Sequence, residues 1–170
     1  MEHNSVLRPL YELEEKGVSV TIVACEKNGT ISCEKIKQAI GKKTKAIVCT
    51  HASNVTGDGN DIAQIGTLCE KYNLYFILDA SQTAGAAGID MEQDHISAIC
   101  FTGHKGLFGP QGTGGIALAD GVCVKPLLSG GSGVHSFERK HPMELPVALE
   151  AGTLNGHGIA DGAQGVSASM

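Results

Sequence analysis

The sequence predicts an α/β fold of three layers, in which helices cover both faces of a mostly parallel β-sheet. Two apolar runs without alternation, 74–79 and 96–103, are typical of strands that are covered on both faces. Segments with helical spacing separate the runs, as crossover helices do between parallel strands. At 170 residues the chain is long enough for one domain with a sizeable core.

The individual elements follow from local patterns. Strands are expected at 18–23, 45–50, 74–79, 96–103 and 114–119. Helices are expected between a cap at Asn4 or Ser5 and Gly17, from Ser32 to about Ile40, from Ile62 to Tyr72, and after His157. A loop rich in Gly, Ser and His joins the last strand to the last helix.

The composition argues against several classes of partner. The formal net charge is −5 and no basic run is present, which argues against a nucleic-acid or anionic-membrane surface. No apolar stretch approaches the roughly 20 residues of a membrane span. Six cysteines show no C-x-x-C pairing, and the histidines have no metal-ligand spacing, so no metal site is expected. With no secretory signal ahead of the cysteines, we expect reduced thiols in a soluble cytoplasmic protein.

Polar side chains stand where two predicted buried strands end. The first strand ends in Asp79, with Gln82 three residues later, and the second ends in Thr102, followed by His104 and Lys105. A lysine next to a buried strand is costly unless its amine is neutral or covalently used, which makes Lys105 a candidate Schiff-base nucleophile. Asp79 is the kind of partner that a pyridinium nitrogen requires. The hydroxyl of Thr102 and the imidazole of His104 are donors that suit a phosphate.

Each of these residues has an ordinary explanation when it is taken alone. An isolated aspartate after a strand is often a turn residue, and an isolated lysine or histidine is most often solvated. Joint occurrence at neighbouring strand ends favours a site for Asp79, Gln82, His104 and Lys105.

Three segments carry a resemblance to a known family. They read HASNVTG from His51, DASQ from Asp79 and TGHKGLFGPQGTG from Thr102. In this order they resemble the class V aminotransferases, and most closely the cysteine desulfurase and selenocysteine lyase branch, which uses pyridoxal 5'-phosphate (PLP). The resemblance runs from Glu2 to Asn155 and implies a PLP-dependent transferase-like large domain of fold type I.

The resemblance implies a role for each residue around the cofactor ring. Lys105 would form the Schiff base with PLP and then move protons, and Asp79 would pair with the pyridine nitrogen. Gln82 and Asn54 would hydrogen-bond the phenolic oxygen. His3 would stack on the ring, so Lys105 and His3 are the expected catalytic residues.

The resemblance also implies contacts beyond the ring. Thr102 and His104 would bind the phosphate of the cofactor, and Thr153 would reach the phosphate in the neighbouring subunit. The expected partners are therefore a second copy of the chain in a homodimer with shared active sites, a small amino-acid substrate and a sulfur-acceptor protein.

Complete members of the family are longer than this chain. We therefore expect residues 1–170 to be a partial PLP-binding large domain, truncated at both ends. The N-terminal phosphate-turn segment and the C-terminal small domain, with its substrate-binding arginine and cysteine loop, would lie outside it. Three functions stay open: a cysteine desulfurase or selenocysteine lyase that yields alanine, a class V aminotransferase for a small amino acid, and an inactive remnant that only binds or oligomerises.

Overall fold

A four-stranded sheet forms the centre of the computed structural model, which describes residues 1–26 and 29–169. The strands lie in the order β1 (Ala46–Thr50), β2 (Tyr75–Asp79), β3 (Ala98–Thr102) and β4 (Gly114–Leu118). The first three are parallel, and β4 pairs with β3 in the antiparallel direction. The predicted α/β class with a mostly parallel sheet is confirmed.

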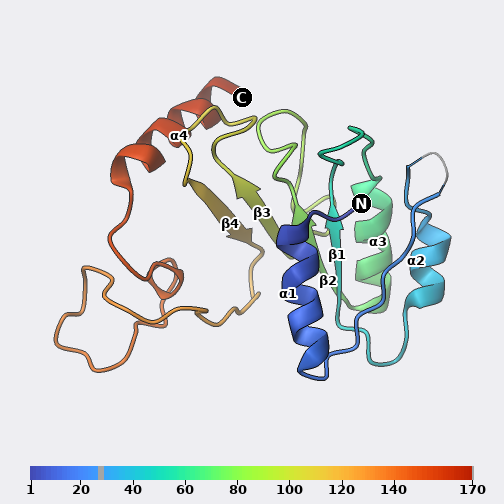
Figure 1. Ribbon diagram of the computed structural model, residues 1–170, viewed down its shortest axis with the longest axis horizontal. Helices are drawn as coiled ribbons and strands as arrows, with labels where there is room; N and C mark the ends of the chain where they lie inside the picture. Colours follow the sequence, from blue (N-terminus) through green and yellow to red (C-terminus); the bar gives the residue numbers. More distant parts are fainter. Residues whose placement is uncertain (27–28, 170) are drawn as a thin grey trace.

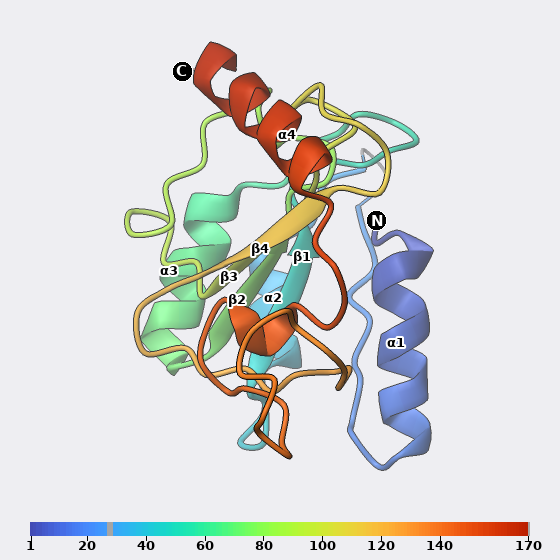
Figure 2. The ribbon, with the colours of Figure 1, turned by 90° about the vertical axis from the view of Figure 1, so that its left-hand side faces the viewer.

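Helices lie on both faces of this sheet, as three layers require. They are α1 (Asn4–Glu15), α2 (Cys33–Ala39), α3 (Ile62–Tyr72) and α4 (Gly156–Ser169), with a 3₁₀ turn at Val147–Leu149. Figure 2 shows α1 and α3 on opposite sides of the sheet, with α4 beyond the end at which β3 finishes. The crossover from β1 to β2 passes through α3, as expected for parallel neighbours.

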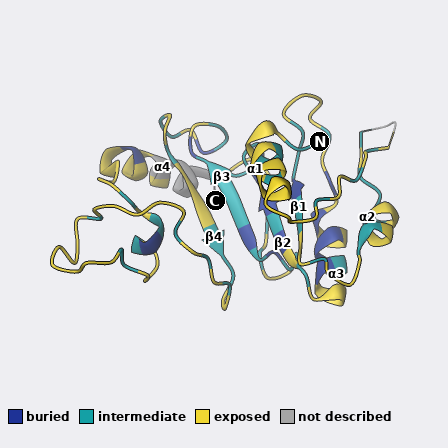
Figure 3. Ribbon diagram, turned by 60° about the horizontal axis from the view of Figure 1, so that its bottom comes forward, coloured by how far each residue is buried: buried dark blue, intermediate teal, exposed yellow. Residues whose placement is uncertain are grey.

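The core lies between the sheet and α3. Its fully buried side chains include Ile65 and Cys69 of α3 and Phe76 and Leu78 of β2. In Figure 3 the dark blue residues concentrate in these elements. Apolar residues at helical spacing place one face of α3 on the sheet, and Asp61 caps the helix by accepting a hydrogen bond from the Gln64 N–H.

Helix α1 differs from α3 because none of its residues is buried. Its N-cap is His3, which corrects the expectation of Asn4 or Ser5. The Nδ1 atom of His3 accepts a hydrogen bond from the Ser5 N–H at 3.1 Å, so an imidazole nitrogen takes the place of the usual side-chain oxygen.

The strand expected at 18–23 is not formed, although the other four predicted strands are. The segment is irregular, and among the described residues it makes no ladder with β1. Val23 packs against the core, whereas Val18 and Ile22 of the alternating pattern are exposed, so the pattern does not mark one buried face. Alternation alone does not make a strand, because a strand also requires a backbone partner.

Residues 119–155 run from β4 to α4 with little regular structure. This stretch is mostly yellow in Figure 3, because many of its apolar side chains are exposed. Among the helices described, none has the length and apolar character needed to cross a membrane.

Candidate functional site

The carboxyl ends of the three parallel strands meet at one edge of the sheet. Thr50, Asp79 and Cys100 lie side by side in the register of β1, β2 and β3. Thr102, two residues further along β3, pairs with Gly114 at the start of the antiparallel strand β4. The loops that carry the predicted site residues therefore leave the sheet at the same edge (Figure 1), where ligands of open α/β sheets bind.

Asp79 is buried at this edge without a cationic partner. It is 8% exposed, and its Oδ1 atom accepts a hydrogen bond from the Ser81 N–H at 2.9 Å. Among the described residues, no lysine or arginine forms an ion pair with it. Burial raises the pKa of the Cys100 thiol, and the charge of Asp79 raises it further. A buried carboxylate in this position favours a cation beside it.

The next strand end supplies a hydroxyl, an imidazole and an amine. The Oγ1 atom of Thr102 and the Nδ1 atom of His104 are hydrogen-bonded at 2.7 Å. This bond leaves the Nε2 atom of His104, an exposed residue, for another partner. Lys105 follows with a half-buried side chain that makes no ion pair within the described part of the chain. An unpaired amine close to a buried strand end is free for chemistry.

Glycines hold the turn after β2 against the turn after β3. A Cβ atom at Gly106 would lie 2.5 Å from the carbonyl oxygen of Ala84, and one at Gly85 would lie 2.6 Å from the carbonyl oxygen of Gly106. Gly85 also has a φ of +80°. Real side chains do not fit at such distances, so only glycine permits this backbone approach. The contact fixes the turn of Gln82 relative to that of Lys105.

The remaining predicted residues lie in connecting segments outside the strands. His3 precedes α1, and Asn54 is exposed in the loop that follows β1. Thr153 is exposed in the segment before α4. The structure thus brings the strand-end residues to one edge, while His3, Asn54 and Thr153 lie in connecting segments.

Two side chains of this edge were not predicted from the sequence. The carboxyl of Glu2 has a buried Oε2 atom, and burial raises its pKa, with a smaller contribution in the same direction from the charge of Asp79. Thr113 sits behind Gly103, where it fills the space that a Cβ atom would need, and its Oγ1 atom donates to the Pro110 carbonyl at 2.6 Å. The only signal for Glu2 was its place directly before His3, and Thr113 could be found only as part of the glycine-rich turn.

The buried thiols are poor nucleophiles. Burial raises the pKa of Cys49 and of Cys69 to about 12, and it raises the pKa of Cys33 in the same direction. The reactive species is the thiolate, so these groups stay unreactive near neutral pH. Cys123 is the exposed thiol of the described cysteines.

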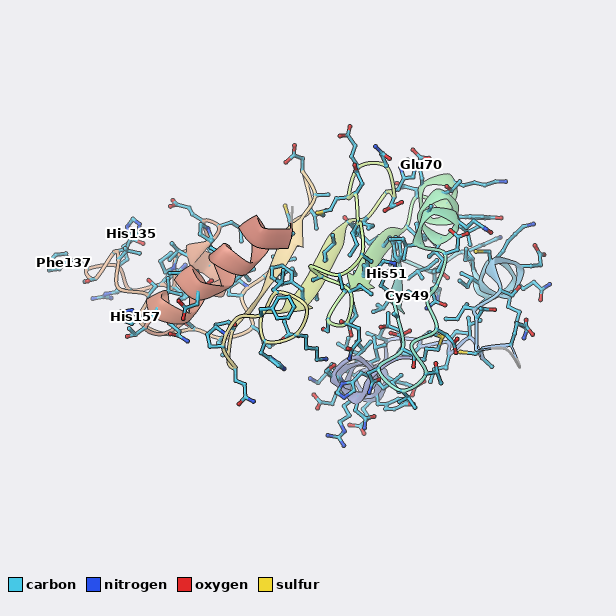
Figure 4. All side chains as sticks on the ribbon, turned by 90° about the horizontal axis from the view of Figure 1, so that it is seen from above. Cys49, His51, Glu70, His135, Phe137 and His157 are labelled. Carbon is cyan, nitrogen blue, oxygen red and sulfur yellow. The ribbon has the colours of Figure 1, made fainter. Side chains whose placement is uncertain are left out.

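Other features of the surface lie away from this edge. An open groove of about 360 Å³ between α2 and α3 is lined by residues such as Lys37 and Lys71 and contains no predicted site residue. In Figure 4, His51 lies near Cys49, whereas His135 and His157 lie at the far end of the molecule. Within residues 1–26 and 29–169, no group of His, Cys, Asp or Glu could hold a metal ion.

Comparison with protein-family models matches residues 1–165 to the class-V aminotransferases. The chain belongs to the class-V aminotransferase family. A curated member of similar sequence, the probable cysteine desulfurase of Methanothermobacter thermautotrophicus, is 33% identical over 159 residues, which cover 91% of this chain and 40% of that protein.

Solved class-V structures agree in fold. The apo cysteine desulfurase of Thermococcus onnurineus NA1 matches with a TM-score of 0.89 and 27% identity, over 99% of this chain and 43% of that one. The structure of SspA in complex with cysteine matches with a TM-score of 0.85 and 27% identity, over 98% of this chain and 45% of that one. The chain thus spans less than half the length of these relatives.

Proposed function

We propose that residues 1–170 form a partial PLP-binding large domain of a cysteine desulfurase, an enzyme that removes sulfur from cysteine to give alanine. The carrying observation is the pair of unbalanced charges at neighbouring strand ends: the buried Asp79 and the amine of Lys105. A cofactor with a cationic ring nitrogen and a carbonyl group satisfies both. The membership of this chain in the class-V aminotransferase family supports the same cofactor.

The donor set at the edge fits PLP. Asp79 has one oxygen engaged by the Ser81 N–H and can hold a proton on a ring nitrogen with the other. His104 and Thr102 offer an imidazole and a hydroxyl for the phosphate. Gln82 lies in the turn that Gly85 and Gly106 hold close to the turn of Lys105, and its amide would contact the phenolic oxygen.

When bound, PLP supplies an electron sink for the electron pair released at the α-carbon of an amino acid. The chain's own residues do the rest. The Nζ atom of Lys105 would hold the cofactor covalently and would then move the proton of the substrate α-carbon. His3, with its Nδ1 atom fixed by the Ser5 N–H, presents a ring of defined orientation. Asn54, in the loop after β1, would contact the phenolic oxygen.

Cysteine is the substrate that we propose, and selenocysteine is its closest chemical analogue. The relatives named above are cysteine desulfurases, and the solved SspA structure is in complex with cysteine. The buried thiols, with their raised pKa values, are unsuited to attack the substrate sulfur.

Two further partners belong to the proposal. A second copy of the chain would form a homodimer with shared sites, and the exposure of Thr153 is compatible with a contact to the site of a neighbouring subunit. A protein that accepts the sulfur would complete the reaction. We place the enzyme in the cytoplasm, where thiols stay reduced.

The covalent bond to Lys105 gives the most direct test. The chain is incubated with PLP and reduced with borohydride, and the modified residue is located by peptide mass spectrometry. We expect the label on Lys105 and a visible absorption band that Lys105→Ala abolishes. Lys125→Ala, which changes an exposed lysine after β4, should leave both unchanged.

Two results would contradict the proposal. Labelling spread over surface lysines, with no loss in Lys105→Ala, would show that the edge does not select PLP. If the labelled chain bound another small amino acid more tightly than cysteine, the cofactor site would be supported. The proposed cysteine desulfurase activity would be contradicted.

A further inference from the structure

The loop of residues 51–60 leaves the sheet at the end of β1, carries Asn54 and returns into α3 (Figure 1). Backbone hydrogen bonds tie its two arms together. The Ser53 N–H donates to the Asp58 carbonyl oxygen at 2.9 Å, and the Gly57 N–H donates to the Ser53 carbonyl oxygen at 3.0 Å. Asn54 lies between these bonded positions, so its place depends on how the whole loop is attached to the sheet.

Asn60 closes the base of this loop. Of residues 51–60, all of which the structure describes, Asn60 alone is buried, with 7% exposed. Its backbone N–H donates to the His51 carbonyl oxygen at 2.8 Å. Its side-chain Nδ2 atom donates to the Thr50 carbonyl oxygen at 2.7 Å. The two bonds hold the returning arm of the loop against the last residue of β1 and the residue after it.

The Thr50 carbonyl needs this side-chain donor. Strand β1 lies at one edge of the described sheet, and an edge strand has backbone groups that no neighbouring strand pairs with. The next residue, His51, turns its N–H toward β2 and donates to the Asp79 carbonyl oxygen at 2.9 Å. Thr50 itself is buried, and the other group that contacts its carbonyl is the Cys49 thiol, a weak donor. The Asn60 amide therefore supplies the strong hydrogen bond of this buried carbonyl.

Asn60 acts here as a donor and not as an acceptor. Its Oδ1 atom is buried and has no hydrogen-bond partner among the described residues, while its Nδ2 atom contacts Thr50 and, at 3.4 Å, the Cys49 sulfur. A carboxylate has the same shape but no proton to donate. At this position it would place an acceptor against the Thr50 carbonyl oxygen and leave both groups buried without a donor.

We propose that Asn60 is a positioning residue of the candidate site: its buried amide fixes the loop that carries Asn54 to the end of β1. That strand end lies beside the site, because Thr50 is opposite Asp79 in the register. The inference rests on the proposed function only for the contact of Asn54 with PLP. The attachment of the loop is a property of the chain without cofactor. A loop that moved at its base would carry the Asn54 amide away from the site.

Amide hydrogen exchange in the cofactor-free chain tests the attachment. Asn60→Asp keeps the shape of the side chain and removes its donor. We expect this substitution to lower the protection factors of the Ser53 and Gly57 N–H groups about tenfold near pH 7, which corresponds to about 1.4 kcal/mol. Unfolding in urea reports whether the variant is folded.

Asn73→Asp is the matched control, because Asn73 is an exposed asparagine at the other end of α3. It makes the same chemical change and should leave the protection of Ser53 and Gly57 as in wild type. Wild-type protection in a folded Asn60→Asp overturns the attachment. If Asn60→Asp does not fold, Asn60→Ala takes its place, since it removes the donor without adding a charge. Wild-type protection in Asn60→Ala, or its failure to fold, also overturns the proposal, because the role would then be absent or would belong to the whole fold.

A double-mutant cycle on PLP affinity, followed by absorbance, tests whether Asn60 acts through Asn54. We expect Asn60→Asp and Asn54→Ala each to weaken PLP binding about fivefold, the loss that a missing hydrogen bond causes. The double variant should bind no more weakly than Asn54→Ala, because the group that Asn60 positions is already absent. A merely structural role would lower the affinity by the same factor in both backgrounds.

The two readouts separate this inference from the proposed function. If wild type does not bind PLP, the proposed function is contradicted, and the exchange result alone decides whether Asn60 attaches the loop. If wild type binds PLP, equal affinity in wild type and Asn60→Asp overturns the positioning role. Equal losses with and without the Asn54 side chain overturn it as well.

Discussion

Asp79 combines burial with the absence of a cationic partner in the part of the chain that the structure describes. Such a charge costs free energy unless hydrogen bonds or a ligand compensate it. One hydrogen bond, from the Ser81 N–H, is present. The effect of the Asp79 charge on the pKa of Glu2 and of Cys100 shows that the excess negative potential extends along the strand ends.

Replacing Asp79 by asparagine separates its charge from its hydrogen bond. The amide oxygen of Asp79→Asn still accepts from Ser81, so the free energy of unfolding should stay within about 1 kcal/mol of wild type in a urea titration. The affinity for PLP should fall roughly ten- to a hundredfold, because a hydrogen bond to a charged group is worth about 1.5–3 kcal/mol. Titration of the chain with PLP, followed by absorbance, measures this loss.

An acid in an exposed turn provides the control. Asp90 accepts backbone hydrogen bonds from Glu92 and Gln93 as Asp79 does from Ser81. Asp90→Asn should therefore change neither unfolding nor PLP affinity. If Asp79→Asn bound PLP as tightly as wild type, the carboxylate would have no part in holding a cationic ring.

At the scale of elements, buried strands and the helix of the core could be predicted from the sequence. The strand ends at Asp79 and Thr102 and the bounds of α3 at Ile62 and Tyr72 agree with the expected positions. These segments have continuous or periodic apolar patterns, because the sheet or the core covers them. Where burial decides the structure, the pattern of apolar residues is enough.

The weakly packed elements were harder to predict. The alternation at 18–23 indicates an extended chain, but the pairing that defines a strand depends on a neighbour that is remote in sequence. The cap of α1 by His3 and the burial of the Glu2 carboxyl depend on how the start of the chain packs against the rest of the molecule. No local pattern contains that information.

Within the candidate site, the strand-end residues could be predicted because sheets place their carboxyl ends together. The contact of Gly85 with Gly106 was not predicted, since two turns that are remote in sequence meet there. This contact joins the turn of Gln82 to that of Lys105. It therefore sets the relative position of an amide and an amine.

A side chain at Gly106 should disturb both turns. The Cβ atom of Gly106→Ala would lie 2.5 Å from the Ala84 carbonyl oxygen, so one backbone must move. We expect a loss of about 1–3 kcal/mol in the free energy of unfolding, as for other overpacked sites. PLP labelling of Lys105 should fall as well, because the amine moves with its turn. Urea unfolding and peptide mass spectrometry measure the two effects.

Gly88 is the matched control for this substitution. A Cβ atom at Gly88 would meet nothing within 4 Å, so Gly88→Ala should be neutral or slightly stabilising. If Gly106→Ala had the stability of Gly88→Ala, the close approach of the two turns would not exist in solution.

At the scale of the whole molecule, two regions have opposite character. Around α3 and β2 the side chains are buried, whereas residues 119–155 expose apolar groups (Figure 3). Leu127 is 95% exposed, and Leu128 and Phe137 are also exposed. Figure 4 shows Phe137 at the far end of the molecule, pointing away from it. Exposed apolar groups in such number mark an interaction surface.

We expect this surface to make the chain associate with itself, in line with the proposed homodimer. Sedimentation velocity over a range of concentrations should show species larger than a monomer. The substitutions Leu127→Asp and Phe137→Asp should shift the distribution toward the monomer. Each substitution places a charge where association would bury it, which costs several kcal/mol. The free energy of unfolding should change little, because both side chains are exposed in the single chain.

Val55→Asp is the control for a charge on an exposed apolar residue elsewhere. Val55 is 84% exposed in the loop after β1, outside residues 119–155. Val55→Asp should leave self-association unchanged if the interaction surface is confined to residues 119–155. A wild-type chain that stays monomeric at all concentrations would contradict the homodimer. Equal dissociation by Val55→Asp and Leu127→Asp would instead place the contact across the end of the sheet that carries Asp79.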